Sequence, residues 1–303
     1  MAKISTDPID KTTLETYLNT ESDFGFEIQV LKQLRGLGAN CAHGSTYEDP
    51  KTNKYREFDI RAHFNSDRSN VRLAVECKNI KDYSPLLVSC LPRTRDQSFH
   101  EIICGFEPRK PKSNPYPAKS SVSSPAEIFM DGNSITVSIG ASESIYKINE
   151  PVGKSCVQVT KVVHDGSFKS SDDEIYDKWS QAVGSCHDLA VNSDLAGYGL
   201  NSGFEYSAVI PVLVVPNNCL WRVCYNNDGT VSGDVEKVDR VSYFIGAELN
   251  GSSIPRFQLT LSHIEFLTFD GITKLVDDFT NNDCLNLMPE WYLKKEIQRK
   301  FQI

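Results

Sequence analysis

Three ionisable side chains in two neighbouring segments could form one reactive patch. Asp59 lies in the segment REFDIRA, and Glu76 and Lys78 stand two residues apart in LAVECKN. Because alternate residues of a β-strand point to the same face, Glu76 and Lys78 emerge together while Val75 and Cys77 point to the opposite face. If the two segments pair as strands, Asp59 joins Glu76 and Lys78 on one polar patch.

Such a patch has the composition needed for phosphodiester hydrolysis. Two carboxylates can hold a hard divalent cation such as Mg²⁺, with Mn²⁺ as a substitute, while waters and substrate oxygens fill the other positions. The metal polarises a phosphoryl oxygen and lowers the pKa of a bound water. Lys78 could orient or deprotonate that water, or stabilise the developing negative charge. The alternative interpretation is a surface Glu–Lys salt bridge, which is common on exposed strands.

The elements that must position these residues are readable from the hydrophobic pattern. Residues 55–64 and 71–78 alternate between apolar and polar side chains, which predicts two β-strands. Residues 39–46 predict a strand before them. Residues 22–36 carry Phe24, Ile28, Leu31 and Leu34 at the spacing of one helical face and end at glycines, so we expect a helix there that buries this face.

The remainder of the chain predicts further strands and helices. Residues 172–191 show a second helical stripe, and 207–215, 219–225 and the segment VSYFIGAEL predict buried strands. Residues 259–279 have a helical pattern, and the tail from Pro289 predicts a charged helix. This order predicts an α/β fold with a mixed central β-sheet flanked by helices. We expect one domain over 1–303, with an insertion at about 81–170 and a helical C-terminal extension at about 256–303.

The overall composition is that of a globular protein. Hydrophobic residues make up 40% of the chain and charged residues 24%, and no apolar run reaches the length of a membrane span. The nine cysteines do not form C-x-x-C pairs, and several stand in apolar segments, which favours free thiols in a reducing compartment. We therefore expect a cytoplasmic protein with no membrane partner and no structural zinc site.

The charge balance bears on nucleic-acid binding. The formal net charge is −8, which counts mildly against a DNA substrate. The stretch from Lys81 to Ser120, however, holds seven Lys and Arg against four Asp and Glu. This stretch is a candidate contact surface for phosphates, although solvated loops often have the same composition.

The reactive patch resembles the PD-(D/E)XK nuclease superfamily, whose fold is the restriction-endonuclease-like fold. In that family an Asp on one strand and a (D/E)-x-K on the next strand form the site, behind an N-terminal helix. Asp59, Glu76 and Lys78 occupy those positions here. Phe58 stands where the family has a proline before the Asp. The resemblance covers residues 23–80, about a fifth of the chain.

The resemblance implies further site residues. It implies that Glu27, on the first helix, and the backbone carbonyl of Cys77 join Asp59 and Glu76 as metal ligands. It also implies that Gln181, on the second helix, orients the site. Glu27 stands on the expected apolar stripe, where an ionised carboxylate is unfavourable unless it is paired or metal-bound. Glu27 could alternatively reach solvent or pair with Lys32 or Arg61, and Gln181 could be a solvated or capping residue.

Residue type alone suggests further, weaker candidates for phosphate contacts and metal ligands. His43 and His63 could contact phosphate or could be structural. Arg93 and Arg95 could clamp a phosphate through two hydrogen bonds each, or could lie in a solvated loop. Glu57 could be a metal ligand, although an exposed salt bridge is the more common role.

The expected function is a Mg²⁺-dependent endonuclease that hydrolyses DNA. The resemblance implies a role in restriction or anti-phage defence, and cutting both strands of a duplex would favour a homodimer or a partner protein. Two alternatives stay open. The chain could be a non-catalytic nucleic-acid-binding or interaction module on the same fold, or a partner-activated nuclease that acts on RNA.

Overall fold

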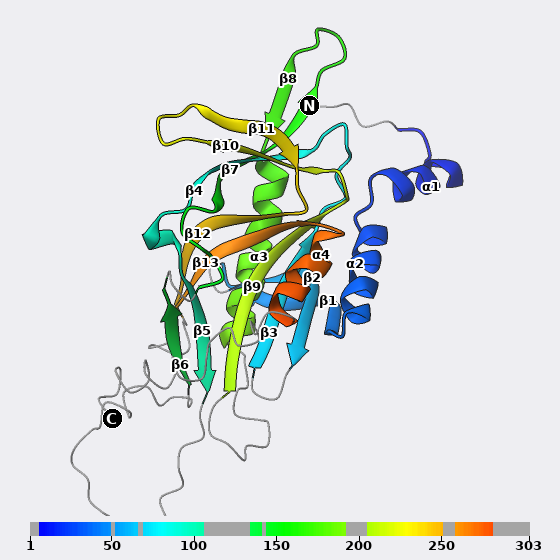
Figure 1. Ribbon diagram of the computed structural model, residues 1–303. Helices are drawn as coiled ribbons and strands as arrows, with labels where there is room; N and C mark the ends of the chain where they lie inside the picture. The colour runs from blue at the N-terminus through cyan, green and yellow to red at the C-terminus, as the bar shows by residue number, and fades with distance from the viewer. Residues whose placement is uncertain are drawn as a thin grey trace, which may run out of the picture.

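A mixed β-sheet with helices on both faces dominates the computed structural model of the chain (Figure 1). The structure describes residues 6–49, 52–65, 69–105, 134–140, 144–191, 205–250 and 258–280. None of the helices within these ranges combines the length and the apolar character needed to cross a membrane. The predicted α/β class, with a mixed central sheet and flanking helices, is confirmed.

The elements follow one another in this order: α1 (Lys11–Thr20), α2 (Phe24–Gly36), β1 (Asn40–Asp49), β2 (Lys54–Asn65), β3 (Ser69–Cys77), β4 (Leu86–Pro92), a 3₁₀ turn (Arg95–Gln97), β5 (His100–Gly105), β6 (Ser134–Ile139), β7 (Pro151–Lys161), β8 (Phe168–Ser171), α3 (Asp173–Val191), β9 (Glu205–Val215), β10 (Leu220–Tyr225), β11 (Val231–Lys237), β12 (Arg240–Asn250), β13 (Gln258–Thr268) and α4 (Gly271–Thr280). The strands predicted over 39–46, 55–64, 71–78, 207–215 and 219–225 therefore exist as β1, β2, β3, β9 and β10.

The strands of the described ranges join one sheet in the order β1-β2-β3-β9-β13-β12-β7-β4-β10-β11, with β5, β6 and β8 attached beside this path. β1, β2 and β3 form an antiparallel meander. β3 then runs parallel to β9, and β9 runs parallel to β13. The mixture of orientations follows from α3, which carries the chain over one face of the sheet before β9 begins.

Different helices cover the two faces of the sheet around β3. Val75 and Cys77 of β3 pack in one hydrophobic cluster with residues of α2 and α4. Ala74, which points the other way, packs in another cluster with Cys186 and Leu189 of α3. The apolar stripe predicted for the second helix is thus buried against the sheet, and polar side chains of β2 and β3 form hydrogen bonds with α3.

Two helical predictions need correction. On α2, Phe24 and Ile28 are exposed, and the buried face is instead formed by Phe26, Val30, Leu31 and Leu34. Residues 259–268, expected to be helical, belong to strand β13, which lies between β9 and β12, and within the predicted stretch the helix begins only at Gly271. The segment mixes apolar and polar side chains, so periodicity alone does not distinguish a strand from a helix here. The remaining part of the predicted C-terminal extension, 281–303, lies outside the described residues.

The described strands within 81–170 extend the same sheet. β4 pairs with β7 and β10, and β7 also pairs with β12 and β8. The Pro- and Ser-rich part of this stretch, 106–133, lies outside the described residues. That residues 81–170 form an insertion into a smaller core remains a prediction.

The polar N-terminal segment also contains a helix that was not predicted, α1, whose first turn is capped by Asp10 and which buries none of its residues.

Candidate active site

β2 and β3 bring Asp59 and Glu76 together on the face of the sheet that α3 covers. Ile60 pairs with Val75 in the antiparallel register, so Asp59 and Glu76 stand one step further along the two strands. The backbone N–H of Asp59 donates to Glu76 Oε1 at 3.4 Å, and the N–H of Cys77 donates to Asp59 Oδ2 at 2.8 Å. The expected convergence of the two carboxylates is therefore present.

A lysine from α3 joins the two carboxylates. Lys178 Nζ donates to Asp59 Oδ2 at 2.8 Å and to Glu76 Oε2 at 3.3 Å. Only 1% of the Glu76 side chain is exposed, and Lys178 and Asp59 are also largely buried. One cation is thus shared by two acidic side chains in a site with little access to water.

Burial sets the electrostatics of this group. The pKa of Glu76 is raised well above its usual value because the carboxyl is desolvated and lies beside Asp59, although Lys178 acts in the opposite direction. Burial alone would lower the pKa of Lys178, but the carboxylates of Glu76 and Asp59 outweigh it and raise that pKa. Glu76 and Lys178 therefore influence each other's charged state.

The Lys78 side chain forms ion pairs with two other acidic residues. Its Nζ lies 3.3 Å from Asp23 Oδ2 and 3.1 Å from Glu174 Oε2. Asp23 also accepts the backbone N–H of Asn79 at 2.8 Å, so the start of α2 is tied to the residues that follow β3. Burial lowers the pKa of Lys78, but Asp23 and Glu174 together raise it. The lysine in contact with the carboxylate pair is therefore Lys178, whereas Lys78 pairs with Asp23 and Glu174.

Glu27 approaches the same group from α2. Its Oε2 lies 3.4 Å from His43 Nε2, and both side chains are mostly buried. The pKa of Glu27 is raised by burial and by the nearby carboxylate of Asp59, and Lys178 and His43 partly offset this. Glu27 thus has a histidine partner, where sequence reasoning had considered a lysine or an arginine.

A row of polar contacts, here called the polar seam, joins α3 to strands β1 and β2 beside the site. Arg61 Nη1 pairs with Asp188 Oδ2 at 2.7 Å, and Arg61 Nε donates to Ser185 Oγ at 3.0 Å. Tyr47 Oη donates to the backbone carbonyl of Gln181 at 3.1 Å. These bonds set the position of α3 on the sheet and therefore the position of the Lys178 ammonium.

The other predicted residues have the following places. Gln181 contributes its backbone carbonyl to the seam, and Cys77 contributes its N–H to Asp59. Arg93 is buried and donates to Lys147 O and Glu150 Oε2, so it belongs neither to a phosphate clamp nor to a solvated loop. Glu57 is exposed on β2.

Sequence reasoning missed Lys178 and Asp23. On α3, Lys178 and Ser185 are seven residues apart, so they stand on one side of the helix, beside the buried stripe that contains Ala182. A row of polar side chains bordering a buried stripe was the available signal. Asp23 directly precedes the first residue of α2, a position where acidic residues are common.

The donor set fits a magnesium-type ion with few protein ligands. In the described part of the chain, no group of three or more His, Cys, Asp and Glu side chains is arranged to hold a metal. Mg²⁺, however, commonly binds through one or two carboxylates and keeps several waters. Asp59 and Glu76 already share one cation, the Lys178 ammonium, through oxygens at 2.8 and 3.3 Å.

No protein-family model, curated protein or solved structure matches the chain. The site must therefore be interpreted from its own chemistry.

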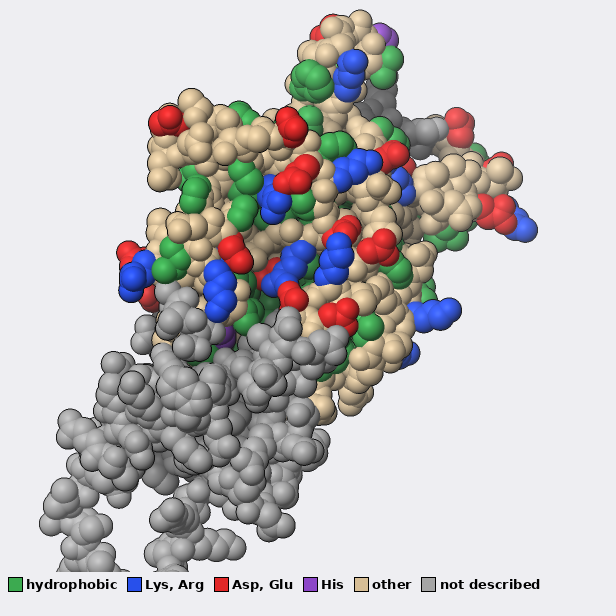
Figure 2. All heavy atoms as spheres, viewed as in Figure 1, with side chains coloured by type: hydrophobic (Ala, Val, Ile, Leu, Met, Phe, Trp, Pro, Cys, Tyr) green, Lys and Arg blue, Asp and Glu red, His purple; other side chains and the backbone are tan. Residues whose placement is uncertain are grey.

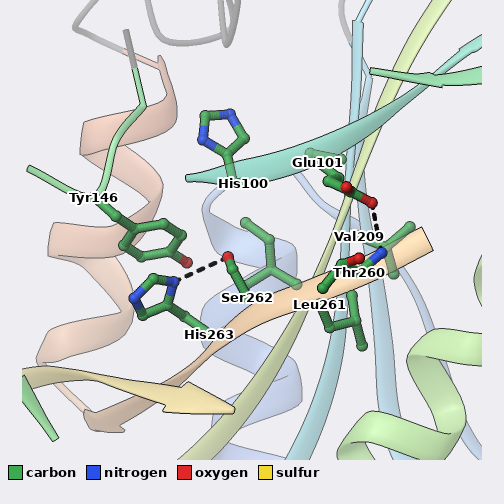
Figure 3. Close-up of a pocket in the computed structure, with 10 residues that line it drawn as sticks. His100, Glu101, Tyr146, Val209, Thr260, Leu261, Ser262 and His263 are labelled. Atoms are coloured by element: carbon green, nitrogen blue, oxygen red, sulfur yellow. Dashed lines mark hydrogen bonds between the residues drawn. The ribbon is translucent and has the colours of Figure 1, made fainter. Parts of the chain in front are cut away.

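A small cavity lies elsewhere, between β5, β9 and β13 (Figure 3). Its polar lining includes His100, Tyr146, Ser262 and His263, and His263 Nδ1 lies 2.9 Å from Ser262 Oγ. The volume is about 20 Å³, which is room for roughly one water molecule. This cavity shares no residue with the carboxylate pair, and it is too small for a nucleotide.

Proposed function

We propose that the chain is a Mg²⁺-dependent nuclease that hydrolyses phosphodiester bonds of DNA. The observation that carries the proposal is the convergence of Asp59 and Glu76, from neighbouring strands, on a single cation. Two buried carboxylates around one positive charge are unfavourable unless that charge is retained or replaced by another. A divalent ion is the replacement that would give the pair a chemical role.

The order of the elements supports a restriction-endonuclease-like core. α2 is followed by the meander β1-β2-β3, then by α3 and by β9, which runs parallel to β3. α2 and α3 lie on opposite faces of the four strands. This arrangement agrees with the expectation of a nuclease core behind an N-terminal helix, with the strands beyond β9 as additions to it.

Each residue of the site would have a distinct task. Asp59 and Glu76 would hold the metal, and Glu27 lies close enough to Asp59 for that carboxylate to raise the pKa of Glu27. When bound, the metal would polarise the phosphoryl oxygen and promote ionisation of a water. Lys78 would place an ammonium group beside the negative charge that develops on the phosphate. The Cys77 N–H orients the Asp59 carboxylate.

The charge of the chain bears on how a nucleic acid would bind, because the formal net charge is −8. Figure 2 shows acidic and basic side chains interspersed over the face it presents, where no single basic patch stands out. Binding would therefore rely on the metal and on a few local cations more than on a broad basic surface. We propose DNA as the substrate, a homodimer or a partner of a defence system as the assembly, and the cytoplasm as the location. The seven cysteines that the structure describes as free thiols support a reducing compartment.

A second candidate is a non-catalytic nucleic-acid-binding module on the same fold. It is favoured by Lys178, because an ammonium that already neutralises both carboxylates lets the fold persist without a metal. The two candidates differ in one measurable property, which is cleavage.

The deciding experiment measures nicking of supercoiled plasmid DNA. The purified full chain is incubated with Mg²⁺ or Mn²⁺, and then with EDTA. Nicking that requires the metal is expected, and D59N and E76Q should each reduce its rate by about a hundredfold or more. E236Q is the matched control, because it removes a half-exposed carboxylate of β11 that pairs with Arg222 of β10.

Two outcomes would contradict the proposal. Metal-dependent nicking that persists in both D59N and E76Q would assign the activity to another site. Binding of DNA without cleavage at any metal concentration would favour the non-catalytic module, and cleavage of RNA alone would replace the substrate.

A further inference from the structure

Lys178 occupies the place that a metal held by Asp59 and Glu76 would need. Its ammonium donates to one oxygen of each carboxylate, Asp59 Oδ2 at 2.8 Å and Glu76 Oε2 at 3.3 Å. The second oxygen of Glu76 faces the N–H of Asp59, and Asp59 Oδ2 also accepts from Cys77 N. Lys178 thus uses the Glu76 oxygen that the Asp59 N–H leaves available, and it shares Asp59 Oδ2 with the Cys77 N–H.

A divalent ion and this ammonium exclude one another. Mg²⁺ binds carboxylate oxygens at about 2.0 to 2.1 Å and demands nearly octahedral geometry. An ammonium bonded to the same two oxygens would lie against the ion, and the two cations would repel each other inside a site that is shielded from water. We propose that Lys178 competes with the divalent metal for Asp59 and Glu76, so that the metal enters only when the Lys178 side chain withdraws.

The fold offers the withdrawn lysine another partner. Glu174 stands one turn before Lys178 on α3, the spacing and order at which Glu and Lys pair favourably on a helix. The Glu174 side chain is 72% exposed and pairs with Lys78. Movement of Lys178 toward Glu174 would therefore also weaken the ion pair between Glu174 and Lys78. Lys78 is the lysine that the sequence motif places at the site.

The inference rests on the proposed function only for the assignment of Asp59 and Glu76 as metal ligands, and its test measures binding. Mn²⁺ is titrated calorimetrically into the metal-stripped full chain and into K178M, which keeps the length of the side chain without its charge. K178M should bind Mn²⁺ at least about tenfold more tightly than the wild type. K178R, which keeps a cation, should stay near the wild type, and D59N/K178M should lose the gain.

Thermal unfolding gives a second readout. Without metal, K178M should melt below the wild type, because two carboxylates are left facing each other in a buried site. Added Mn²⁺ should raise the melting temperature of K178M more than that of the wild type. K178Q is measured beside K178M, because its amide can still donate to one carboxylate and so protects against loss of folding.

The outcomes separate this inference from the nuclease proposal. Equal or weaker Mn²⁺ binding by K178M and K178Q would overturn the competition, even if the wild type nicks plasmid DNA. Tighter binding by these variants would support the competition, even if no form cleaves any nucleic acid and the nuclease proposal fails.

Discussion

The Lys178 ammonium lies 2.8 Å from the Asp59 carboxylate, although 119 residues separate the two in the chain. This contact joins α3 to β2 at the point where β2 and β3 present their acidic side chains. The Arg61–Asp188 pair and the Arg61–Ser185 hydrogen bond anchor the same helix further along the same strand. The position of α3 therefore decides which cation the carboxylate pair receives.

Asp23 should matter more for stability than Glu174, although both pair with Lys78. Only 22% of the Asp23 side chain is exposed, and it also accepts the N–H of Asn79, whereas 72% of Glu174 is exposed. D23A should lower the free energy of unfolding by about 1 to 3 kcal/mol, because a backbone N–H loses its partner. E174Q should lower it by less than about 1 kcal/mol. Urea denaturation of the two variants measures the difference, and equal losses would contradict this ranking.

Whether the sequence predicts a contact of this site depends on how far apart in the chain the contacting residues lie. Alternation along two adjacent strands was enough to place Asp59 and Glu76 on one face, because strand geometry is local. The partner of Lys78 depends on where α2 begins, and the reach of Lys178 depends on how α3 lies across the sheet. Neither is fixed by periodicity. β13 was mistaken for a helix for a related reason, since its segment mixes apolar and polar side chains and its place between β9 and β12 is revealed only by the assembled sheet.

Arg240 should be required for folding because it neutralises a fully buried acid. Arg240 Nε donates to Glu265 Oε2 at 2.7 Å, and its Nη1 pairs with the exposed carboxylate of Asp278 at 2.5 Å. R240M would leave Glu265 buried without this cation and should destabilise the chain by about 3 kcal/mol or more. D278N removes only the exposed partner and should change stability by less than about 1 kcal/mol. Chemical denaturation of both variants tests this, and a small effect of R240M would show that Glu265 does not need the pair.

His263 should make the fold sensitive to mild acid. Burial, together with nearby cationic groups that include Arg93, lowers the pKa of His263 to about 2, and its ring stacks on Tyr146 at 3.7 Å between ring centroids. The unfolded chain therefore takes up a proton below about pH 6.5 that the folded chain does not, and stability falls as the pH decreases. The slope from this one group approaches about 1.4 kcal/mol per pH unit.

The H263Q variant isolates that contribution. Its free energy of unfolding, measured by urea denaturation from about pH 6.5 to about pH 5, should fall less steeply than that of the wild type. The comparison uses the slope because the substitution itself can lower stability at every pH. Identical slopes would mean that His263 is not the group whose protonation opposes folding.

Gly184 and Tyr47 should be energetically coupled, because α3 approaches β1 where the helix lacks a side chain. A Cβ at position 184 would lie 2.8 Å from Tyr47 Oη but at ordinary contact distances from the ring carbons. G184A should therefore destabilise the chain by about 1 to 3 kcal/mol through overpacking. Y47F should lose about 1 kcal/mol, because Tyr47 Oη donates to Gln181 O. In the double variant the clashing oxygen is gone, so the combined loss should be smaller than the sum of the single losses by about 0.5 kcal/mol or more. Urea denaturation of all four forms gives this coupling, and strictly additive losses would show that the helix accommodates the methyl group by some other movement.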